Sequence, residues 1–319
     1  MESNELVSKV LVLDDCGEHK ERLKRFCSEN SLVGLKVRED CLMSVLQSNI
    51  DLGAILLSEG YAGDMAHSAE IALAIHKVRP ELPIVLRRER TATLADLAPA
   101  QQHVFCGAYV AHDLAPLRRI VDEYIFSLDY PNALVRGILD ISEVMLGTVL
   151  PGCTVEWDAP CIVRDRIIFG EVFSLIPLES SWCRGYMMMQ AEERSVLDLL
   201  NTLQMTDGDA GFRDLNSLLG EATNLIWGAF KNRYLGDAAS LSRSQVQVPL
   251  IVNHQQKYIS FGTENPQLVF KYRLVHARSG KTVHLHQRFI FNLAWSPEDF
   301  KEVPADVDNM VGSGELELF

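Results

Sequence analysis

A carboxylate and an amide lie three residues apart in the stretch GEATNLIWG, residues 220–228. If this stretch is helical, Glu221 and Asn224 share a face with Ser217, because residues three, four and seven apart lie on the same side of a helix. A carboxylate can form ion pairs, and a side-chain amide can both accept a hydrogen bond from a water and donate one to it. The spacing alone is common by chance. These residues are therefore either a solvated helix surface or two working parts of an active site.

The helix that must position them is predicted over residues 212–234. Its other side chains are largely apolar, so the polar stripe faces either water or a partner. The apolar side chains that can cover the rest of this helix are Leu215, Leu218, Leu219, Ile226 and Phe230.

The second half of the chain mixes strands with long helices without strict alternation, which is typical of an α+β domain. We expect this domain to span residues 132–296 and to begin with a helix at 133–149. Strand-like stretches, a helix at 193–204, the helix at 212–234 and further strands follow, and one of the strand-like stretches covers residues 161–178.

The first half, residues 1–128, alternates short apolar runs with helical patterns. Alternation of this kind predicts an α/β doubly wound domain with a five-stranded parallel sheet covered on both faces. Asp129, Tyr130 and Pro131 mark the boundary, since proline disfavours helix at the residue before it. The predicted strands cover residues 9–15, 33–37, 53–58, 83–88 and 107–112, and the predicted helices cover residues 18–26, 66–78 and 114–128.

Composition limits the classes of function. The chain has 319 residues, enough for two domains, and a formal net charge of −13, which disfavours nucleic acid and anionic membrane surfaces as partners. Its seven cysteines are scattered and form no CxxC pair, which indicates a reducing compartment and no zinc site. With no leader and no spanning segment in view, we expect a cytoplasmic protein. The acidic tail, residues 297–319, is either a solvated end or a docking segment.

The run VLVLDD, with the five-stranded α/β pattern around it, resembles the receiver domain of bacterial response regulators. The resemblance implies an acidic pair that binds Mg²⁺, an aspartate that accepts the phosphoryl group, a Thr or Ser, and a Lys. Asp14 and Asp15 supply the acidic pair, but Ser58 stands at the phosphoacceptor position, Arg88 at the Thr/Ser position and His112 at the lysine position. Three of the four functional positions thus depart from the family pattern.

We therefore interpret residues 1–128 as a pseudo-receiver that is not phosphorylated at this site, because serine cannot form an acyl phosphate. If the alignment is shifted by one residue, Glu59 is the nearest carboxylate. Asp14 and Asp15 are then either residual solvated charge or a weak Mg²⁺ site. Such a domain can still offer a surface for docking or dimerisation.

The stretch DLNSLLGEATNLIWGAF resembles the signature helix of the CheC/CheX/FliY family of chemotaxis phosphatases. The matching positions are Ser217, Glu221, Asn224 and, further along, Pro249, and Gly220 and Gly228 also match. One copy of the signature is present, which favours the CheX-like branch, and that branch implies a homodimer.

The resemblance also implies a reaction, namely hydrolysis of the aspartyl phosphate on a CheY-type response regulator. In that reaction Asn224 would position the attacking water and Glu221 would bind the lysine of the partner's active site, while Ser217 would play a supporting part. No cofactor of its own is implied, because Mg²⁺ arrives with the phosphorylated substrate. The alternative is a non-catalytic adaptor that binds a response regulator or a motor or kinase complex. A third possibility, an output regulator switched by its own phosphorylation, is disfavoured by Ser58.

Overall fold

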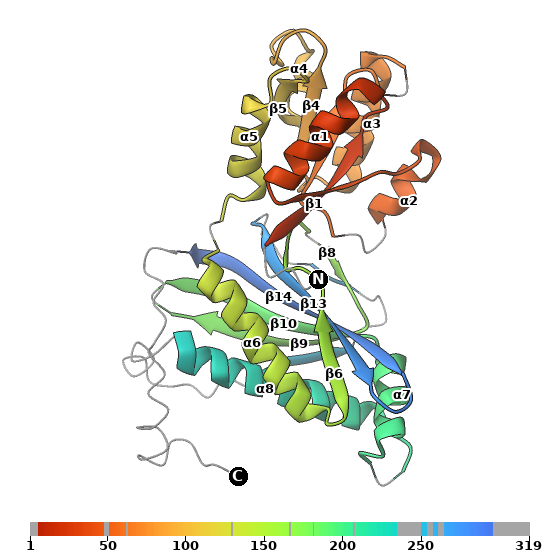
Figure 1. Cartoon of the computed structure of the whole chain (residues 1–319), viewed down its shortest axis with the longest axis vertical. Helices are drawn as coiled ribbons and strands as arrows, with labels where there is room; N and C mark the ends of the chain where they lie inside the picture. Colours follow the sequence, from red (N-terminus) through yellow and green to blue (C-terminus); the bar gives the residue numbers. More distant parts are fainter. Residues whose placement is uncertain are drawn as a thin grey trace.

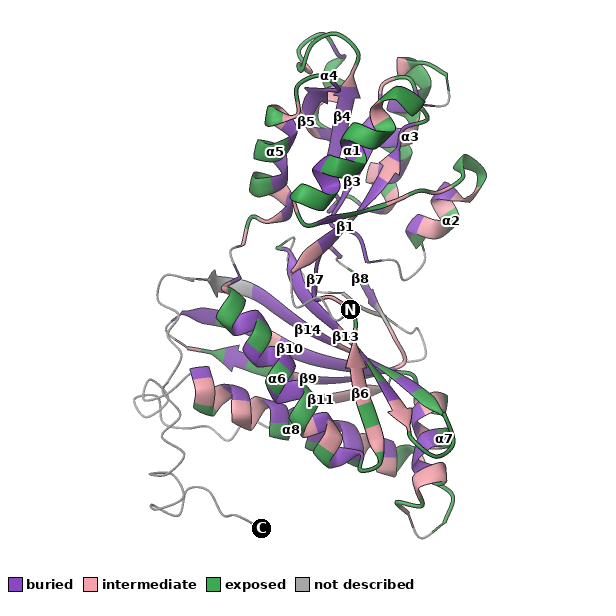
Figure 2. Ribbon diagram, in the orientation of Figure 1, coloured by how far each residue is buried: buried purple, intermediate pink, exposed green. Residues whose placement is uncertain are grey.

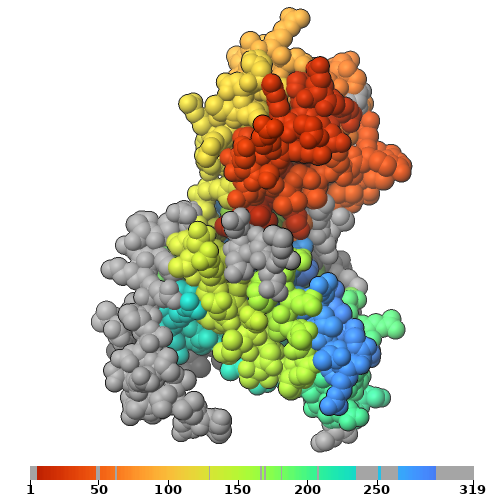
Figure 3. Space-filling view, in the orientation of Figure 1, coloured from red at the N-terminus to blue at the C-terminus, as the bar shows by residue number. Residues whose placement is uncertain are grey.

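The computed structural model describes residues 6–47, 51–61, 63–128, 130–165, 167–180, 182–206, 208–234, 250–253, 258–260 and 265–295. Figure 1 shows two parts stacked along the long axis, with the N-terminal part above and the second part below. In the space-filling view they form two lobes joined by a narrower region (Figure 3).

The N-terminal part is built around a parallel sheet with the strand order β2-β1-β3-β4-β5. The predicted parallel sheet is therefore confirmed for this region. Helices lie on both of its faces, so β3 is buried along its whole length. The elements are β1 (Val7–Leu13), α1 (Gly17–Glu29), β2 (Leu32–Leu35), a 3₁₀ turn (Glu39–Cys41), α2 (Leu42–Gln47), β3 (Ala54–Ser58), α3 (Met65–Val78), β4 (Ile84–Arg88), α4 (Pro99–Gln102), β5 (Phe105–Val110), α5 (Ala115–Ile120) and a π-helical turn (Val121–Ile125).

The second part has an antiparallel sheet with the order β11-β9-β10-β14-β13. Helix α8 has the bounds that the sequence predicts, whereas the strand-like stretch over 161–178 divides into the separate strands β7, β8 and β9. The elements are α6 (Asn132–Val149), β6 (Cys153–Trp157), β7 (Cys161–Val163), β8 (Ile167–Phe169), β9 (Val172–Glu179), β10 (Cys183–Ala191), α7 (Glu193–Leu203), α8 (Phe212–Tyr234), β11 (Leu250–Asn253), β12 (Tyr258–Ser260), β13 (Gln267–His276) and β14 (Thr282–Trp295).

Helices α6 and α8 lie side by side across one face of the antiparallel sheet (Figure 1). The largest apolar core cluster fills the space between these helices and the sheet. Figure 2 shows the consequence: the strands and the inward helix faces are buried, while the outward faces of both helices are exposed. The sheet therefore holds α8 in place and leaves one side of it free.

Strand β7 joins the sheets of the two parts, which the sequence did not predict. It pairs antiparallel with β13 and parallel with the start of β1, where Val7 lies opposite Cys161 and Ser8 opposite Ile162. Since Ser8 also pairs with Leu32 of β2, β7 lies on the other side of β1, end to end with β3. The result is a single 12-stranded sheet that runs through both parts.

Buried charges reinforce this junction. Asp51, in the segment before β3, forms an ion pair with Arg288 of β14 at 3.0 Å and another with Lys271 of β13. Burial opposes ionisation of Asp51, but Arg288 and Lys271 outweigh it and lower the pKa of this carboxyl to about 2. Arg79, after α3, donates to the carbonyl of Arg164 at 2.9 Å. Breaking one buried pair costs about 3–5 kcal/mol, so these contacts fix the two parts relative to each other.

Two positions singled out from the sequence lie outside the described residues. Pro249 of the signature is one, and the acidic tail at 297–319 is the other. Among the described helices, none combines the length and the apolar composition that crossing a membrane requires.

Candidate functional site

The rotation of α8 about its axis is set by a buried polar contact as well as by apolar packing. Thr223 is fully buried and donates its hydroxyl to Ser174 Oγ of β9 at 2.7 Å. Neighbouring apolar residues, among them Ala222 and Ile226, are buried in the same core. A buried hydroxyl pair tolerates little rotation, because an unpaired hydroxyl there costs about 1–3 kcal/mol. The contact therefore fixes the direction in which Asn224, the next residue, projects.

Both ends of α8 are also held by hydrogen bonds. At the start, Asp214 Oδ2 accepts from the backbone N–H of Gly211 at 2.8 Å. At the end, the indole Nε1 of Trp182 donates to the carbonyl of Tyr234 at 3.2 Å. Carbonyls in the last turn of a helix have no partner within the helix, so this indole stabilises the end that points toward β10.

Ser217, Glu221 and Asn224 lie together on the exposed side of α8, as the sequence predicts for a helix. Within the described part of the chain, none of the three side chains has a hydrogen-bond or ion-pair partner. Leu225, beside Asn224, leaves 36% of its surface exposed. The stripe thus offers a carboxylate, an amide and a small apolar contact, all available to a partner.

Two glycines flank the stripe without being required by the fold of this chain. A Cβ atom added at Gly220 or Gly228 would meet nothing within 4 Å. Glycine within a helix destabilises it by about 0.5–1 kcal/mol relative to alanine. At these two positions the missing side chains leave the backbone of α8 open to close approach from outside.

The N-terminal part does not cover this stripe. In Figure 1, α8 lies in the second part, well away from β1–β5 and their helices. Asn224 is exposed in the complete chain. A docked protein can therefore reach the amide without displacing either part.

The acidic end of β1 presents the opposite situation. Asp14 is buried, and its two carboxylate oxygens accept from Arg87 of β4 at 2.7 and 3.3 Å. The same guanidinium donates to the hydroxyl of buried Ser58 at 2.6 Å and to Glu89 at 2.7 Å. Burial disfavours the charge on Arg87, but Asp14 and Glu89 outweigh it and hold the pKa above its ordinary value. The charged groups of this pocket therefore pair with one another, and no outside ligand is needed to balance Asp14.

The arginine in that pocket is Arg87 and not the predicted Arg88. The pairing of β3 with β4 places Arg87 directly opposite Ser58. Successive side chains of a strand point to opposite faces, so Arg88 extends elsewhere and pairs with Glu59 and with Asp96, the latter at 2.6 Å. Both faces of this sheet are covered, so apolar alternation gave no signal of the register.

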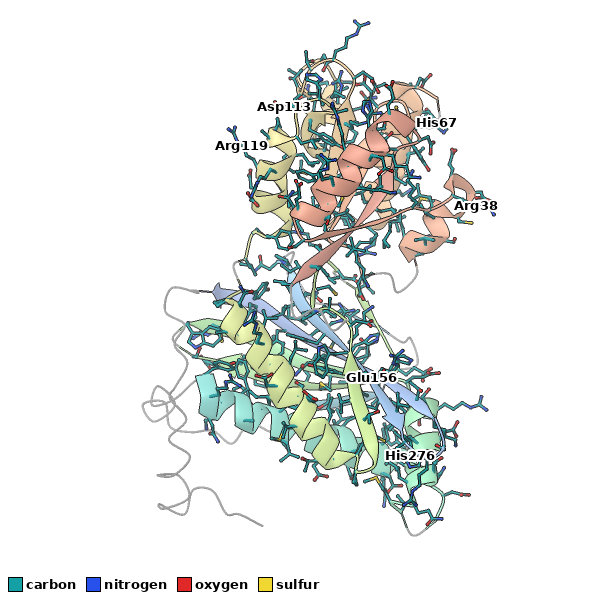
Figure 4. The ribbon with its side chains drawn as sticks, in the orientation of Figure 1. Arg38, His67, Asp113, Arg119, Glu156 and His276 are labelled. Carbon is teal, nitrogen blue, oxygen red and sulfur yellow. The ribbon has the colours of Figure 1, made fainter. Side chains whose placement is uncertain are left out.

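The other two predicted pocket residues, Asp15 and His112, do not join Asp14 and Ser58. Both are exposed, and β5 ends at Val110, so His112 lies in the turn that follows. Figure 4 shows the adjacent Asp113 at the outer end of the N-terminal lobe. Its carboxylate accepts from the N–H of Ala115 and so helps to start α5. A lysine-like contact from position 112 to Ser58 is absent among the described residues.

Magnesium does not fit the Asp14 pocket as it is arranged. Both oxygens of Asp14 are engaged by Arg87, and the exposed Asp15 supplies no second buried ligand. A divalent cation prefers several oxygen ligands at close range, and here the guanidinium of Arg87 takes the place that the cation would occupy. The weak Mg²⁺ site considered from the sequence is therefore not supported by the geometry. Nearby, Cys16, Glu18 and His19 place potential ligand atoms within 4.8 Å of one another at the partly exposed start of α1.

With the open stripe on α8 established, a comparison with protein families can be set beside it. Residues 172–273 match the family model of the chemotaxis phosphatase CheX. This stretch begins with β9, the strand that holds Thr223, and includes the whole of α8. The stripe thus lies within the stretch that matches the CheX family model, and Thr223, which the sequence analysis did not single out, anchors it. A small polar residue on the apolar side of the helix was the signal available for Thr223.

Solved structures of chemotaxis proteins are distantly similar to this chain. A putative chemotaxis protein from Desulfovibrio vulgaris Hildenborough is 17% identical, covers 49% of this chain and 95% of its own, and has a TM-score of 0.37. CheX from Desulfovibrio desulfuricans is 13% identical, covers 49% of this chain and 97% of its own, and has a TM-score of 0.37. A chain of the CheX–CheY–BeF₃–Mg²⁺ complex from Borrelia burgdorferi is 16% identical, covers 49% of this chain and 96% of its own, and has a TM-score of 0.32. No curated protein matches the chain.

Proposed function

We propose that this protein hydrolyses the aspartyl phosphate of a separate CheY-type response regulator, using the exposed stripe of α8. The observation that supports the proposal most is the exposure of Asn224 on a helix that lies within the stretch matching the CheX family model. An aspartyl phosphate is already activated, so the enzyme needs chiefly to orient a water in line with phosphorus. A strong base is not needed.

Docking is the first step of this mechanism. The partner's phosphorylated pocket approaches α8 over Gly220 and Gly228, where side chains do not obstruct the helix backbone. Glu221 then forms an ion pair with the lysine of that pocket, and removal of water from the pair fixes the orientation of the partner. Leu225 adds a small apolar contact beside it. Ser217 supports the interaction without taking part in the chemistry.

Positioning of water is the second step. The amide of Asn224 accepts one hydrogen bond from the water and donates another to it, which aligns a lone pair of the water with phosphorus. As the oxygen of the water bonds to phosphorus, the bond from phosphorus to the aspartyl oxygen breaks and the aspartate leaves as a free carboxylate. The protons of the water stay on the phosphate or pass to solvent, and inorganic phosphate is released. Mg²⁺ belongs to the substrate receiver and stabilises charge there. The rigid anchor at Thr223 keeps the amide in place during this step.

For the N-terminal part, residues 1–128, we propose a pseudo-receiver that recruits or orients the partner without being phosphorylated. Its five parallel strands suit that assignment, and Ser58 and Arg87 replace groups that phosphorylation requires. The CheX-like domain is proposed to span residues 132–296. A cytoplasmic location, expected from the sequence pattern, and a homodimer, implied by the resemblance, stay predictions.

A phosphate-release assay tests the proposal. Phosphorylated regulators from the same organism are incubated with the wild-type protein and with Asn224→Ala. We expect the wild type to accelerate phosphate release and Asn224→Ala to reduce that acceleration by about 100-fold, because the water loses its orienting group. Binding to a beryllofluoride-activated regulator should change little.

Asn232→Ala is the matched control, since Asn232 is an exposed asparagine two turns further along α8. It should retain full activity. If Asn224→Ala remains as active as Asn232→Ala, the assigned role of the amide is wrong. If the wild type binds a regulator but accelerates no hydrolysis, the adaptor function replaces the phosphatase.

A further inference from the structure

A groove of about 450 Å³ lies between α1 and β2 on the N-terminal part, away from the CheX domain. Figure 1 shows α1 lying in front of the sheet that contains β1. Ligand sites for small molecules usually enclose about 300–1,000 Å³. The volume therefore suits a small molecule.

The floor of the groove is apolar because a glycine stands where a side chain would cover it. Gly34 of β2 lies on the α1 side of the sheet, and a Cβ added there would lie 3.6 Å from Val12 and 3.9 Å from the thiol of Cys27. Val12 is consequently only half-buried, although Val10 on the same face of β1 is fully buried. Leu23 of α1 closes the far wall. An apolar group can occupy the volume that Gly34 leaves free.

The rim of the groove is positively charged, in contrast to the chain as a whole. Lys20, Lys24 and Lys36 line it, and its one carboxylate, Asp14, is already neutralised by Arg87. Lys24 pairs with Glu21 at 3.2 Å, which leaves Lys20 and Lys36 to supply the positive charge. Lys36 donates to the backbone carbonyl of Asp14 at 3.1 Å, and neither Lys36 nor Lys20 has a carboxylate partner among the described residues. Such charge on a protein of net charge −13 attracts an anion locally.

From this combination we propose that the groove binds a small amphipathic anion, with its apolar body against Val12, Leu23 and Cys27 and its carboxylate, sulfonate or phosphate head at Lys20 and Lys36. The ligand binds reversibly, without any covalent step. The site is independent of the proposed phosphatase reaction, because it uses none of the α8 residues.

Fluorescence titration of the full-length protein tests the site with two probes. Anilinonaphthalene sulfonate carries a negative charge, whereas phenylnaphthylamine has a similar apolar body without the charge. We expect saturable one-to-one binding of the sulfonate, about tenfold tighter than that of the uncharged probe, because only the sulfonate engages the lysines. Equal affinities for the two probes would overturn the assignment of an anionic ligand.

Variants locate the probe. Gly34→Leu fills the groove and should abolish saturable binding. Gly147→Leu should not, because Gly147 lies on α6 in the other part and a Cβ there would meet nothing within 4 Å. Lys20→Gln should weaken binding of the sulfonate by about threefold to tenfold, while Lys77→Gln on α3 has no effect. Circular dichroism verifies that each variant is folded. Unchanged binding by folded Gly34→Leu would overturn the proposal.

A labelling measurement covers the case in which Gly34→Leu does not fold. Cys16 is half-buried and lines the groove, while Cys153 is half-buried and lies on β6 in the other part. Saturating sulfonate should slow alkylation of Cys16 in the wild type and leave that of Cys153 unchanged. Equal rates for Cys16 with and without the probe would place the probe elsewhere and contradict the proposal.

Discussion

The pocket at the end of β1 and the stripe on α8 both carry acidic side chains, but they differ in how those side chains are satisfied. In the pocket, Asp14 and Ser58 are buried and bonded to Arg87 of the same chain. On the stripe, Glu221 and Asn224 project from the surface and have no partner among the described residues. A buried charge must be paired within the protein, whereas an exposed charge is solvated by water and can form an ion pair with another molecule. The comparison separates a structural use of polar residues from a use in binding or catalysis.

Arg87→Ala should produce the largest effect if the pocket is structural. Removal of the guanidinium leaves Asp14 buried without a counter-ion, which destabilises the protein by about 3–5 kcal/mol. Urea unfolding measures the loss, and Glu221→Ala and Asn224→Ala, on the stripe, should each stay within about 0.5 kcal/mol of wild type.

The double variant Asp14→Asn/Arg87→Ala should lose less stability than Arg87→Ala alone, because no buried charge is left unpaired. An Arg87→Ala protein as stable as wild type would show that the pocket is hydrated and not closed.

The buried charges at the junction between the N-terminal part and the second part provide a test of how stability depends on pH. Asp165 follows β7 in the second part, and its carboxylate lies 3.7 Å from the guanidinium of Arg79 in the N-terminal part. Burial raises the pKa of Asp165 to about 6, against the opposing effects of Arg79 and Arg288. Because the folded-state pKa exceeds that of the unfolded chain, stability from this group is full at pH below about 4 and is lost as the pH rises through about 6. Asp165→Asn should therefore become more stable relative to wild type over this range, by about 2–3 kcal/mol at the plateau.

Urea unfolding of both proteins between pH 4 and pH 8 measures this difference. Taking the difference removes the contributions of groups that both proteins share, including His286, whose pKa burial lowers to about 4. A difference that is independent of pH would mean that Asp165 titrates normally.

Glu221→Gln should weaken productive docking on the stripe without altering the fold. Loss of the ion pair with the partner's lysine should lower kcat/KM for phosphate release by about tenfold, which corresponds to about 1.4 kcal/mol. The change should fall on KM more than on kcat, and it should diminish at high salt, where the wild-type ion pair is screened. A tenfold fall in kcat with KM unchanged would assign Glu221 to the chemical step instead.

Gly228→Ala should produce the smallest effect, and it tests stability and partner binding at the same position of the stripe. Alanine meets nothing within the protein at this position, so the variant should be about 0.5–1 kcal/mol more stable than wild type. The added methyl group should weaken binding to the activated regulator if the partner approaches the helix backbone closely. Thermal melts and a binding titration measure the two effects, and tighter binding by the variant would contradict close approach at this glycine.

Much of the architecture was predictable because it follows from local patterns. The strand–helix alternation before residue 128 predicts a parallel sheet, and the polar and apolar positions of 212–234 predict α8 and its exposed stripe. The short helix α2 and the division of residues 161–178 into separate strands were not predicted. Short elements carry a weak periodic signal, and their limits depend on what they pair with.

The sequence by itself determined that Ser217, Glu221 and Asn224 share one side of a helix, since helical geometry relates residues three, four and seven apart whatever surrounds them. Only the tertiary structure decided that Arg87 and not Arg88 closes the acidic pocket, because the register between β3 and β4 depends on pairing across strands. The same holds for β7, which joins the two parts by pairing with residues far away in the chain. Contacts within one helix or strand follow from the spacing of nearby residues, whereas contacts between elements depend on how the whole chain packs.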